Sequence, residues 1–485
     1  DKDHAKVVQE IQQLAKKAKT TYIATDEDRE GEAIGYHITQ TLGLPSENFP
    51  RIVFHEITKN AIQNALKSPR TIDMDKVNAQ QARRLLDRIV GFKLSNLISS
   101  KIARGLSAGR VQSAALKIVV DREREIEAFK SVTYYLITAT FKSLENAIIE
   151  SELVSYGGKA LQKLSLQDSK EVSAMLNSLK KQSYSITQII TKHKKTSTPP
   201  PFMTSTLQQS ASTKLGFNPT RTMSIAQRLY EGVQTHSGVM GVITYMRTDS
   251  LNIAKEATMA ARELLGKEYG KAYVPTKPKV YTTKSKAAQE AHEAIRPTNL
   301  DFTPEIAKGY LKPEEYKLYK LIYERFLASQ SADAEFELQN IIFESTTDQK
   351  AQFKANGRKL VFDGFYKITG YEESDTLLPP LQEGKSVNLV EVQSHTKHTE
   401  PPARYSEASL IKTLESLGIG RPSTYAPTIA LLCSRDYLKN EKKTLIPQEN
   451  AFKVTQMLEE GFNEIVDSSF SASLEDKLDS IAQHK

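Results

Sequence analysis

The sequence predicts a multidomain protein that combines an α/β domain with helical domains and a β-rich domain. Length is the first reason, because 485 residues exceed the ~250–300 residues at which a single hydrophobic core stops growing. The second reason is a change of pattern: residues 1–66 alternate helix-like and strand-like runs, whereas residues 133–190 alternate apolar and polar positions as strands do. Third, two proline-rich linkers, at residues 192–201 and 398–402, bracket a separate segment.

The composition limits the function classes. With 66 Lys and Arg against 58 Asp and Glu, the formal charge is +8, which favours a polyanionic partner. The single cysteine, Cys433, excludes an internal disulfide framework and cysteine-based zinc ribbons, and it is typical of a reducing compartment. The chain has neither a long apolar run nor a Gly-x-x-x-x-Gly-Lys-Ser/Thr loop. We therefore expect a cytoplasmic protein with no membrane partner and no nucleotide cofactor.

The first 66 residues predict part of a doubly wound α/β domain. Residues 4–19 have the apolar spacing of an amphipathic helix, and residues 21–24 are typical of a short strand. An acidic turn at residues 25–32 follows and leads into a second helix, and residues 51–54 add another strand. Such folds bind ligands beyond the carboxyl ends of their strands, so the acidic turn is a candidate site.

The acidic turn carries Asp26, Asp28 and Glu30 at alternate positions. Three carboxylates this close do not all stay ionised without a cation. Mg²⁺ suits them, because it prefers oxygen ligands and takes one or two carboxylates together with water. The alternative is a solvated acidic loop whose carboxylates cap the following helix.

Residues 78–98 predict one long helix. Arg84 and Arg88 lie on the same face, where like charges repel unless an anion lies between them. We therefore expect them to contact nucleic-acid phosphates or base edges, and a solvated face is the alternative. The side expected to face a core comprises Leu85, Leu86, Ile89 and Val90.

The two linkers introduce a possible internal repeat. After each one, a Ser/Thr-rich stretch predicts two helices joined by a glycine turn, at residues 204–217 and 406–419. Nucleic-acid-binding proteins often use such helix-turn-helix pairs, although chance similarity is the alternative. The second copy continues into residues 418–425, whose glycines, Arg421, hydroxyls and helix start suit a phosphate.

Tyr245 is the candidate nucleophile. It lies in an apolar run at residues 241–246, and Arg247 lies two positions on, so both side chains point to the same side if the run is extended. A phenol is a weak nucleophile at neutral pH, and a guanidinium both stabilises its phenolate and holds the oxygens of a phosphate. The pair therefore predicts attack on a phosphodiester. A half-buried strand tyrosine beside an exposed arginine is the alternative.

His292 is a second candidate in the segment between the linkers. It lies four residues before Arg296, where a zinc protease would have another histidine, so the zinc-protease pattern is absent. A histidine beside an arginine can bind a phosphate or pass a proton to a leaving oxygen. A purely structural histidine is the alternative.

Four motifs together resemble those of the bacterial DNA topoisomerase I family, which is of type IA. They are residues 24–34 around the acidic turn, residues 106–113, residues 243–250 with Tyr245, and residues 291–298 with His292. They occur in the family's order and extend over nearly the whole chain. Topoisomerase III and the topoisomerase half of reverse gyrase are near alternatives, but Met246 and the form of the fourth motif are more similar to the bacterial topoisomerase I family.

The resemblance implies a torus of four domains. They are a partial Toprim domain at residues 1–66, a helical ring-closing domain with a DNA groove at 67–131 and 403–485, a β-rich hinge domain at 132–201 and 301–402, and a helical domain with the active-site tyrosine at 202–300. The family's Toprim fold begins with a strand that carries a glutamate, and no such stretch precedes Asp1. We therefore expect an N-terminally truncated core that binds DNA but cleaves it poorly.

The resemblance also implies the reaction, which is ATP-independent relaxation of negatively supercoiled DNA by a monomer that cuts one strand transiently. Tyr245 would form a 5′-phosphotyrosyl link with single-stranded DNA, Arg247 would position the phosphate, and His292 would contact the DNA nearby. The carboxylates of the acidic turn, Glu30 included, would bind Mg²⁺ and transfer protons. The residues implied to line the strand-binding groove are Arg84, Arg88, Phe92, Arg110, Gln112, Arg421, Ser423 and Thr424.

Three other functions fit parts of the pattern. A topoisomerase III-like decatenase shares the motifs. A Toprim nuclease or primase would use the carboxylates but would have no role for Tyr245. A cleavage-deficient fragment that binds single-stranded DNA is the third alternative. We expect the protein to associate with the nucleoid in the cytoplasm.

Overall fold

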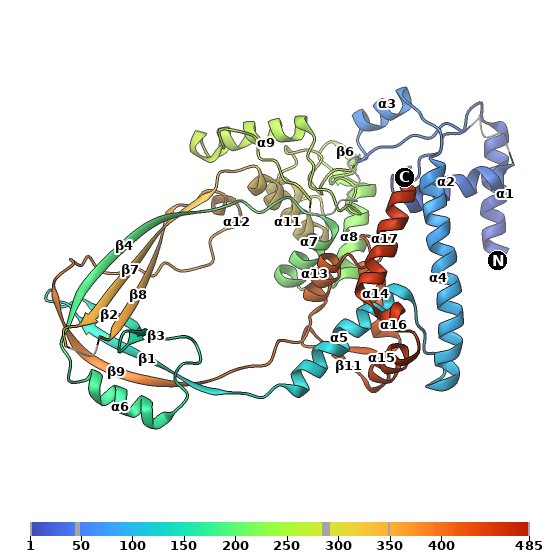
Figure 1. Cartoon of the computed structure of the whole chain (residues 1–485). Helices are drawn as coiled ribbons and strands as arrows, with labels where there is room; N and C mark the ends of the chain where they lie inside the picture. The colour runs from blue at the N-terminus through green and yellow to red at the C-terminus, as the bar shows by residue number, and fades with distance from the viewer. Residues whose placement is uncertain (1, 44–48, 284–291, 348–349, 484–485) are drawn as a thin grey trace.

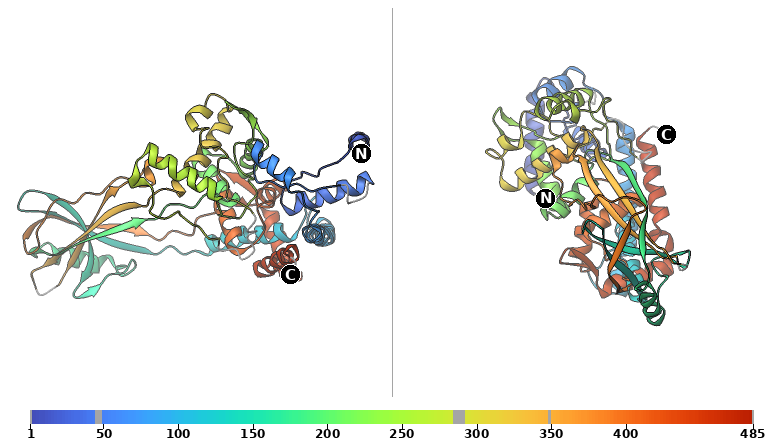
Figure 2. Two further views of the ribbon diagram at one scale, coloured as in Figure 1. Left: turned by 90° about the horizontal axis from the view of Figure 1, so that it is seen from above. Right: turned by 90° about the vertical axis from the view of Figure 1, so that its left-hand side faces the viewer.

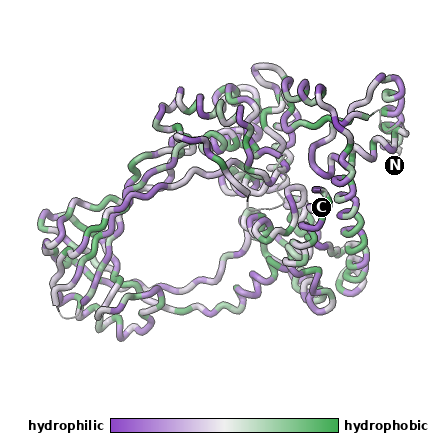
Figure 3. Tube along the Cα trace, turned by 45° about the horizontal axis from the view of Figure 1, so that its top comes forward, coloured by the Kyte–Doolittle hydropathy of each residue, from purple (hydrophilic) through white to green (hydrophobic). Residues whose placement is uncertain are grey.

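The computed structural model describes residues 2–43, 49–283, 292–347 and 350–483. The chain forms a ring: helices gather at one end, a curved β-rich arm lies at the other, and long segments connect them on both sides (Figures 1 and 3). This confirms the expected torus. Seen from above, the N-terminus and the β-rich arm lie at opposite ends of the molecule (Figure 2). None of the helices in the described ranges has the length and apolar composition needed to cross a lipid bilayer.

In its described residues, 2–43 and 49–67, the N-terminal unit has three helices and very little regular sheet. The helices are α1 (Lys2–Lys17), α2 (Arg29–Leu42) and α3 (Lys59–Lys67). The two expected strands are reduced to one parallel bridge between Ile23 and Arg51. The apolar core of the unit is correspondingly small, and its buried residues are Ala15, Ile23, Leu42 and Phe49. Polar contacts must therefore contribute to the order of this unit.

A buried ion cluster supplies those contacts. Glu32, on α2, and Arg51 are both fully buried, and the Arg51 Nε donates to Glu32 at 3.1 Å. Arg51 also donates to the Asp26 carbonyl at 2.7 Å, so it fixes the acidic turn. Burial by itself would raise the pKa of Glu32, but hydrogen bonds from Arg70 and from the Asp73 N–H outweigh it and lower that pKa.

The turn before α2 requires a glycine. Asp28 caps the helix, because its Oδ1 accepts a hydrogen bond of 2.7 Å from the Gly31 N–H. A Cβ atom at Gly31 would lie 2.1 Å from the Asp26 carbonyl oxygen, which is a collision with backbone. For Asp28, the expected alternative that a carboxylate of the acidic turn caps the following helix is therefore confirmed. The cap uses the Oδ1 atom only, so the Oδ2 atom of Asp28 is left for another contact.

The helices that close the ring come from two distant parts of the chain. They are α4 (Met74–Lys101), α5 (Arg110–Ala128), α13 (Glu407–Leu417), α14 (Tyr425–Ser434), α15 (Glu449–Gly461), α16 (Asn463–Val466) and α17 (Ser468–Ala482), with a hairpin of β10 (Leu438–Glu441) and β11 (Thr444–Pro447). One apolar core joins residues 94–120 to residues 405–466. Burial of this shared core holds the two parts together.

The prediction for the apolar side of α4 is wrong. Leu85, Leu86 and Ile89 are exposed, and of the four predicted residues Val90 packs against the shared core, in which Leu94 and Ile98 are buried. Apolar residues occur on both sides of this helix, so their periodicity does not identify the side that finds a packing partner.

The β-rich arm is an antiparallel sheet that closes on itself. Its strands are β1 (Thr133–Lys142), β2 (Ile148–Tyr156), β3 (Lys159–Ala160), β4 (Tyr184–Thr196), β7 (Ala334–Ser345), β8 (Gln352–Phe362) and β9 (Ser386–His398), with α6 (Ser169–Leu179) packed against β1 and β9. The order is β1-β9-β4-β7-β8-β2-β3, and β1 also pairs with β2. Two separate stretches of the chain therefore share one sheet, whose interior contains the packed rings of Phe141, Tyr184 and Phe353.

The remaining unit carries Tyr245. Its elements are α7 (Thr204–Ser210), η2 (Ala211–Leu215), α8 (Pro219–Glu231), β5 (Val233–Thr235), β6 (Gly238–Met240), α9 (Lys255–Glu268), η3 (Lys271–Tyr273), α10 (Pro304–Ala307) and α11 (Pro313–Ser329), and α12 (Tyr366–Thr369) packs against α11. Residues 202–246 and 295–327 contribute to one core. Because α10 and α11 pack in this core, the unit extends to residue 329, beyond the boundary at residue 300 expected from the sequence.

Both copies of the predicted repeat form a helix, a glycine turn and a second helix. Gly216 and Gly418 end the first helix of each copy with φ angles of 70° and 71°, which lie in the left-handed region that favours glycine. The first helices of the two copies, α7 and α13, pack against each other. The repeat therefore joins the tyrosine unit to the ring-closing helices.

Candidate active site

The segment that carries Tyr245 is held between two others. On one side, the Tyr245 N–H donates to the His55 carbonyl of the N-terminal unit at 2.8 Å. On the other side, the Thr244 hydroxyl donates to the Ala294 carbonyl at 2.8 Å. The segment contains one isolated bridge, at Ile243, rather than the expected strand. Pairing to both neighbours nevertheless fixes the direction of the tyrosine side chain.

The Tyr245 hydroxyl contacts the acidic turn. It donates a hydrogen bond of 2.6 Å to Asp28 Oδ2, while the Oδ1 atom of Asp28 caps α2. The Nη1 atom of Arg247 lies 3.9 Å from the same Oδ2 atom. The phenol, the guanidinium and a carboxylate of the acidic turn are thus together, and Tyr245 is only 4% exposed.

Burial and the neighbouring carboxylates keep the phenol protonated. Burial raises the pKa of Tyr245 far above its ordinary value, Asp28 and Asp26 raise it further, and Arg247 opposes them only in part. Burial and the charge of Asp28 likewise raise the pKa of Asp26. Negative charge is therefore in excess here, so a phenolate forms only when a cation is added or a proton acceptor takes its proton.

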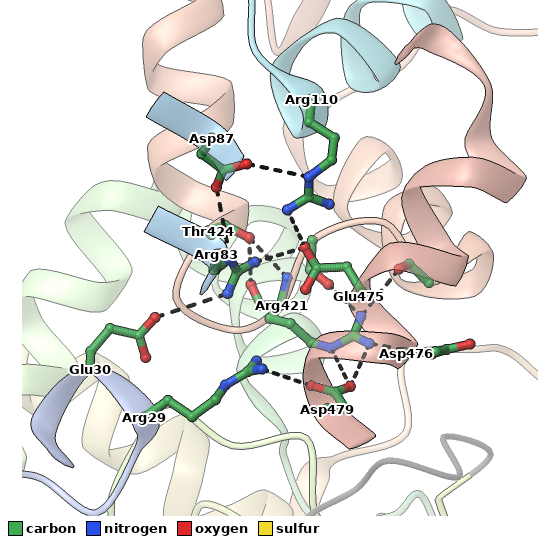
Figure 4. A network of polar contacts seen from close by, with 12 residues as sticks. Arg29, Glu30, Arg83, Asp87, Arg110, Arg421, Thr424, Glu475, Asp476 and Asp479 are labelled. Atoms are coloured by element: carbon green, nitrogen blue, oxygen red, sulfur yellow. Dashed lines mark hydrogen bonds and ion pairs between the residues drawn. The ribbon is translucent and has the colours of Figure 1, made fainter. Parts of the chain in front are cut away.

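The carboxylates of the acidic turn fit Mg²⁺ only in part. Within the described ranges, no set of three Asp, Glu, His or Cys side chains is placed to ligate one metal ion. Glu30 instead points toward Arg83, at 3.9 Å (Figure 4). Asp28 lies close enough to Asp26 for its charge to raise the pKa of the Asp26 carboxyl. The predicted three-carboxylate set is therefore not assembled, whereas this pair suits an ion that keeps several waters.

Two residues that the sequence analysis did not select lie near the tyrosine. His55 Nδ1 and Glu27 Oε2 form an ion pair at 2.6 Å, and the His55 ring lies 6.2 Å from that of His292. The His292 ring lies 6.4 Å from the Tyr245 ring. Among the described residues, the buried Nε2 of His292 has no hydrogen-bond partner, and burial lowers the pKa of this ring. A neutral histidine is therefore available to a phosphate or to a leaving oxygen.

The Glu27–His55 pair predicts a pH dependence of stability. The hydrogen bond to Glu27 raises the pKa of His55 above 6.5, and His55 in turn lowers the pKa of Glu27 below 4.5 although burial opposes this. The pair's stabilising contribution is complete between pH 4.5 and 6.5, and it is lost as the pH rises through the raised pKa of His55. We expect a loss of up to about 1 kcal/mol, because the His55 side chain is 34% exposed.

The measurement compares the hydrogen-exchange protection of the α2 amides, which follow Glu27 in the chain, between the unchanged protein and His55→Gln from about pH 5 to about pH 9. The unchanged protein should lose stability relative to the variant as the pH rises. His37→Gln, on the exposed side of α2, is the matched control and should follow the unchanged protein. Parallel curves for His55→Gln and the unchanged protein would contradict the prediction.

A small cavity of about 60 Å³ adjoins the Tyr245–Asp28 contact. The residues predicted from the sequence that line it are Asp28, Glu30, Arg247, His292, Arg421 and Ser423. The tertiary structure thus brings the predicted residues from four separate parts of the sequence to one cavity, and Asp479 adds a fifth part.

Arginines beside this cavity are bound by carboxylates of α17 (Figure 4). Glu475 accepts hydrogen bonds from Arg83 at 2.9 Å and from Arg110 at 2.8 Å, and Asp479 pairs with Arg421 at 2.6 Å. Arg110 and Arg421 were predicted, but neither carboxylate was. Glu475 and Asp479 lie four residues apart on one helix, and this spacing was the signal in the sequence that could have identified them.

The other predicted groove residues are dispersed. Arg84, Arg88 and Phe92 lie on the exposed side of α4, where the Arg88 guanidinium is 5.4 Å from the centre of the Phe92 ring. Gln112 is buried and donates to a backbone carbonyl of the preceding loop at 3.0 Å, and the Thr424 hydroxyl accepts from a backbone N–H of its own turn at 2.8 Å. Gln112 and Thr424 therefore hold local backbone in this conformation.

Comparison with known proteins adds independent information. A family model described as DNA topoisomerase matches residues 71–485, and one described as Toprim domain matches residues 1–57. The chain is 64% identical, over all its 485 residues, to DNA topoisomerase 1 of Helicobacter pylori, and it covers 65% of that protein. It is 56% identical to DNA topoisomerase 1 of Campylobacter jejuni, where it covers 68% of the relative.

A solved structure has the same fold. Full-length topoisomerase I from Thermotoga maritima matches with a TM-score of 0.86 and 42% identity, over 99% of this chain and 77% of that chain. The chain thus spans 65% of the length of its Helicobacter pylori relative and a larger share of the Thermotoga maritima protein. The family matches, the identities and the fold together show that the chain belongs to the bacterial type IA DNA topoisomerases.

Proposed function

We propose that the chain is the catalytic part of an enzyme that relaxes negatively supercoiled DNA by cutting and resealing one strand. The observation that carries this proposal is the 2.6 Å contact between the Tyr245 hydroxyl and Asp28, with Arg247 at 3.9 Å from the same carboxylate. A nucleophile, a proton acceptor and a phosphate-binding cation therefore lie together. Membership of the family supports the same reaction.

The reaction exchanges one phosphate ester for another. The Tyr245 oxygen attacks the phosphorus of a phosphodiester, its proton passes to Asp28, and the bond from phosphorus to the 3′ oxygen breaks. The 3′ oxygen takes up a proton and leaves as a hydroxyl, while the 5′ phosphate stays on the tyrosine. Resealing reverses these steps, so the number of ester bonds is conserved and no nucleotide is consumed.

Neighbouring residues have distinct roles in the proposal. Arg247 would hold the phosphate oxygens, and His292 would contact the strand near the leaving oxygen through its unpartnered Nε2. Asp26 and Asp28 would hold Mg²⁺, which when bound supplies positive charge beside the phosphate. Glu30, which lines the same cavity, would serve proton transfer.

DNA reaches Tyr245 only after the N-terminal unit and the tyrosine unit separate, because the side chain is 4% exposed. Separation breaks the backbone bond from Tyr245 to His55, the hydrogen bond from Tyr245 to Asp28 and the 3.2 Å ion pair between Arg296 and Glu56. The units must therefore close again on the bound strand before Asp28 takes the tyrosine proton. The two proline-rich linkers to the β-rich arm are the proposed hinges of this opening. We infer a monomer that acts in this way on single-stranded regions of cytoplasmic DNA.

The test of the proposal is a covalent adduct between protein and DNA. The chain is incubated with Mg²⁺ and a single-stranded oligonucleotide, denatured, and separated on a gel. A 3′ label should stay with the protein and a 5′ label should not, because the tyrosine keeps the 5′ phosphate. Negatively supercoiled plasmid is relaxed in parallel. The proposal fails if neither adduct nor relaxation appears, including with a version extended at its N-terminus to match the relatives.

The two carboxylates predict different Mg²⁺ responses. Asp26→Asn should raise the Mg²⁺ concentration for half-maximal adduct formation by about 10-fold or more, because one ligand is lost. Asp28→Asn should also lower adduct formation at saturating Mg²⁺, because it removes the acceptor of the Tyr245 proton. Asp301→Asn, at an exposed position, is the control. Mg²⁺ titrations of adduct formation measure this, and identical curves for all three variants would refute it.

A further inference from the structure

Glu475 of α17 binds arginines from two other helices (Figure 4). Its Oε1 accepts from the Nη2 of Arg83 on α4 at 2.9 Å and from the Nη2 of Arg110 on α5 at 2.8 Å. Burial by itself would raise the pKa of this fully buried carboxyl, but Arg83, Arg110 and Arg421 outweigh burial and lower it. Glu475 is therefore ionised and restrains both guanidinium groups.

Asp479, one helical turn further along α17, binds arginines from two more segments. The Nη2 and Nε of Arg421, in the loop between α13 and α14, donate to its Oδ2 at 2.6 and 3.1 Å. The Nη1 of Arg29, on α2 of the N-terminal unit, lies 3.0 Å from its Oδ1. One face of α17 thus restrains four arginines that the sequence places far apart.

Stability does not account for this network on its own. A buried ion pair costs desolvation, so its net contribution to folding is small compared with well-packed apolar side chains. Two of the arginines, Arg29 and Arg421, line the cavity beside Asp28 and Arg247. Among the described residues, the buried Nη1 of Arg110 has no hydrogen-bond partner. Asp479 therefore orients Arg29 and Arg421 beside the place where a phosphate would enter, and Arg110 retains one N–H without a partner among the described residues.

We propose that Glu475 and Asp479 are positioning residues for DNA cleavage. They fix the directions of arginines that meet the phosphates of the bound strand, and they do not touch the strand themselves, because like charges repel. The inference rests on the proposed function and specifies what aligns the strand with the tyrosine. Loss of either carboxylate would add net positive charge, which favours general DNA attraction, but it would release the arginines from their orientation.

The test is a double-mutant cycle between Glu475 and Arg110. Glu475→Gln should lower the rate of adduct formation at saturating single-stranded DNA by about 10-fold or more, with low-salt affinity unchanged or tighter. In an Arg110→Met background, the same substitution should change the rate by less than about 3-fold, because its effect passes through Arg110. Asp479→Asn is the second variant, with the same fall expected through Arg421, and it decides the question if Glu475→Gln does not fold.

The control is Glu464→Gln, an exposed glutamate on α16 that should behave as the unchanged protein. A variant whose melting temperature falls while its folded fraction forms adduct at the unchanged rate would overturn the inference, and so would additive effects in the cycle. If neither the unchanged protein nor its N-terminally extended version forms adduct, the proposed function fails, and the inference, which rests on it, fails with it.

Discussion

Tyr245→Phe is expected to abolish covalent adduct formation, with a fall of at least about 10³-fold. Phenylalanine keeps the ring that packs edge-on against Tyr230 at 5.2 Å, so only the attacking oxygen is removed. The hydroxyl donates a hydrogen bond to Asp28, and loss of this donor leaves the Asp28 Oδ2 atom with its 3.9 Å contact to Arg247. Binding of single-stranded DNA should therefore be retained while cleavage is lost.

The measurement combines the denatured-adduct gel with fluorescence anisotropy of a labelled oligonucleotide. Tyr310→Phe is the matched control, since Tyr310 is an exposed tyrosine of the same unit. It should form adduct at the unchanged rate. Adduct in Tyr245→Phe at more than a trace level would show that another residue is the nucleophile.

Glu32→Gln is expected to destabilise the N-terminal unit by about 3–5 kcal/mol. The glutamine has nearly the same shape, but the fully buried Arg51 and the partly buried Arg70 would lose the charge that balances them. The Glu32 carboxylate now accepts from Arg51 at 3.1 Å, from Arg70 at 2.8 and 2.9 Å, and from the Asp73 N–H at 2.6 Å. The small apolar core of this unit cannot compensate for such a loss.

Hydrogen exchange of the α2 amides measures this effect locally, which is necessary because a chain of several units does not unfold in two states. Protection in α2 should fall in Glu32→Gln and remain in Glu10→Gln, an exposed position on α1. Because the pKa of Glu32 is lowered, its contribution is present above pH 4.5 and is lost as the pH falls through that lowered pKa. Equal protection in both variants would contradict the prediction.

Adduct formation should fall in Glu32→Gln as well, for a reason that differs from that in Tyr245→Phe. Arg51 donates to the Asp26 carbonyl at 2.7 Å, so release of Arg51 loosens the acidic turn that faces the tyrosine. Added Mg²⁺ should restore part of the activity, because an ion held by Asp26 and Asp28 would tighten the same turn. Tyr245→Phe has no such recovery, since its missing atom is the nucleophile itself.

Local signals allowed much of the architecture to be predicted. An alternating pattern identified the β-rich stretch at residues 133–190, and Gly216 and Gly418 marked the ends of the first helices in the repeat. The Tyr-x-Arg pair and the dense acidic turn were recognisable because their chemistry lies within a few residues. Each of these features depends on spacing along the chain, which the sequence records directly.

Tertiary structure alone decided the partners of these features. The bond from Tyr245 to Asp28 joins positions 217 residues apart, and that from Arg83 to Glu475 joins positions 392 apart. Sequence periodicity could not show which side of α4 would be buried, nor that Glu30 would point toward Arg83 and away from a shared metal site. The physical reason is that helix and strand signals arise from the nearest few residues, whereas burial and ion pairing depend on which distant surfaces pack together.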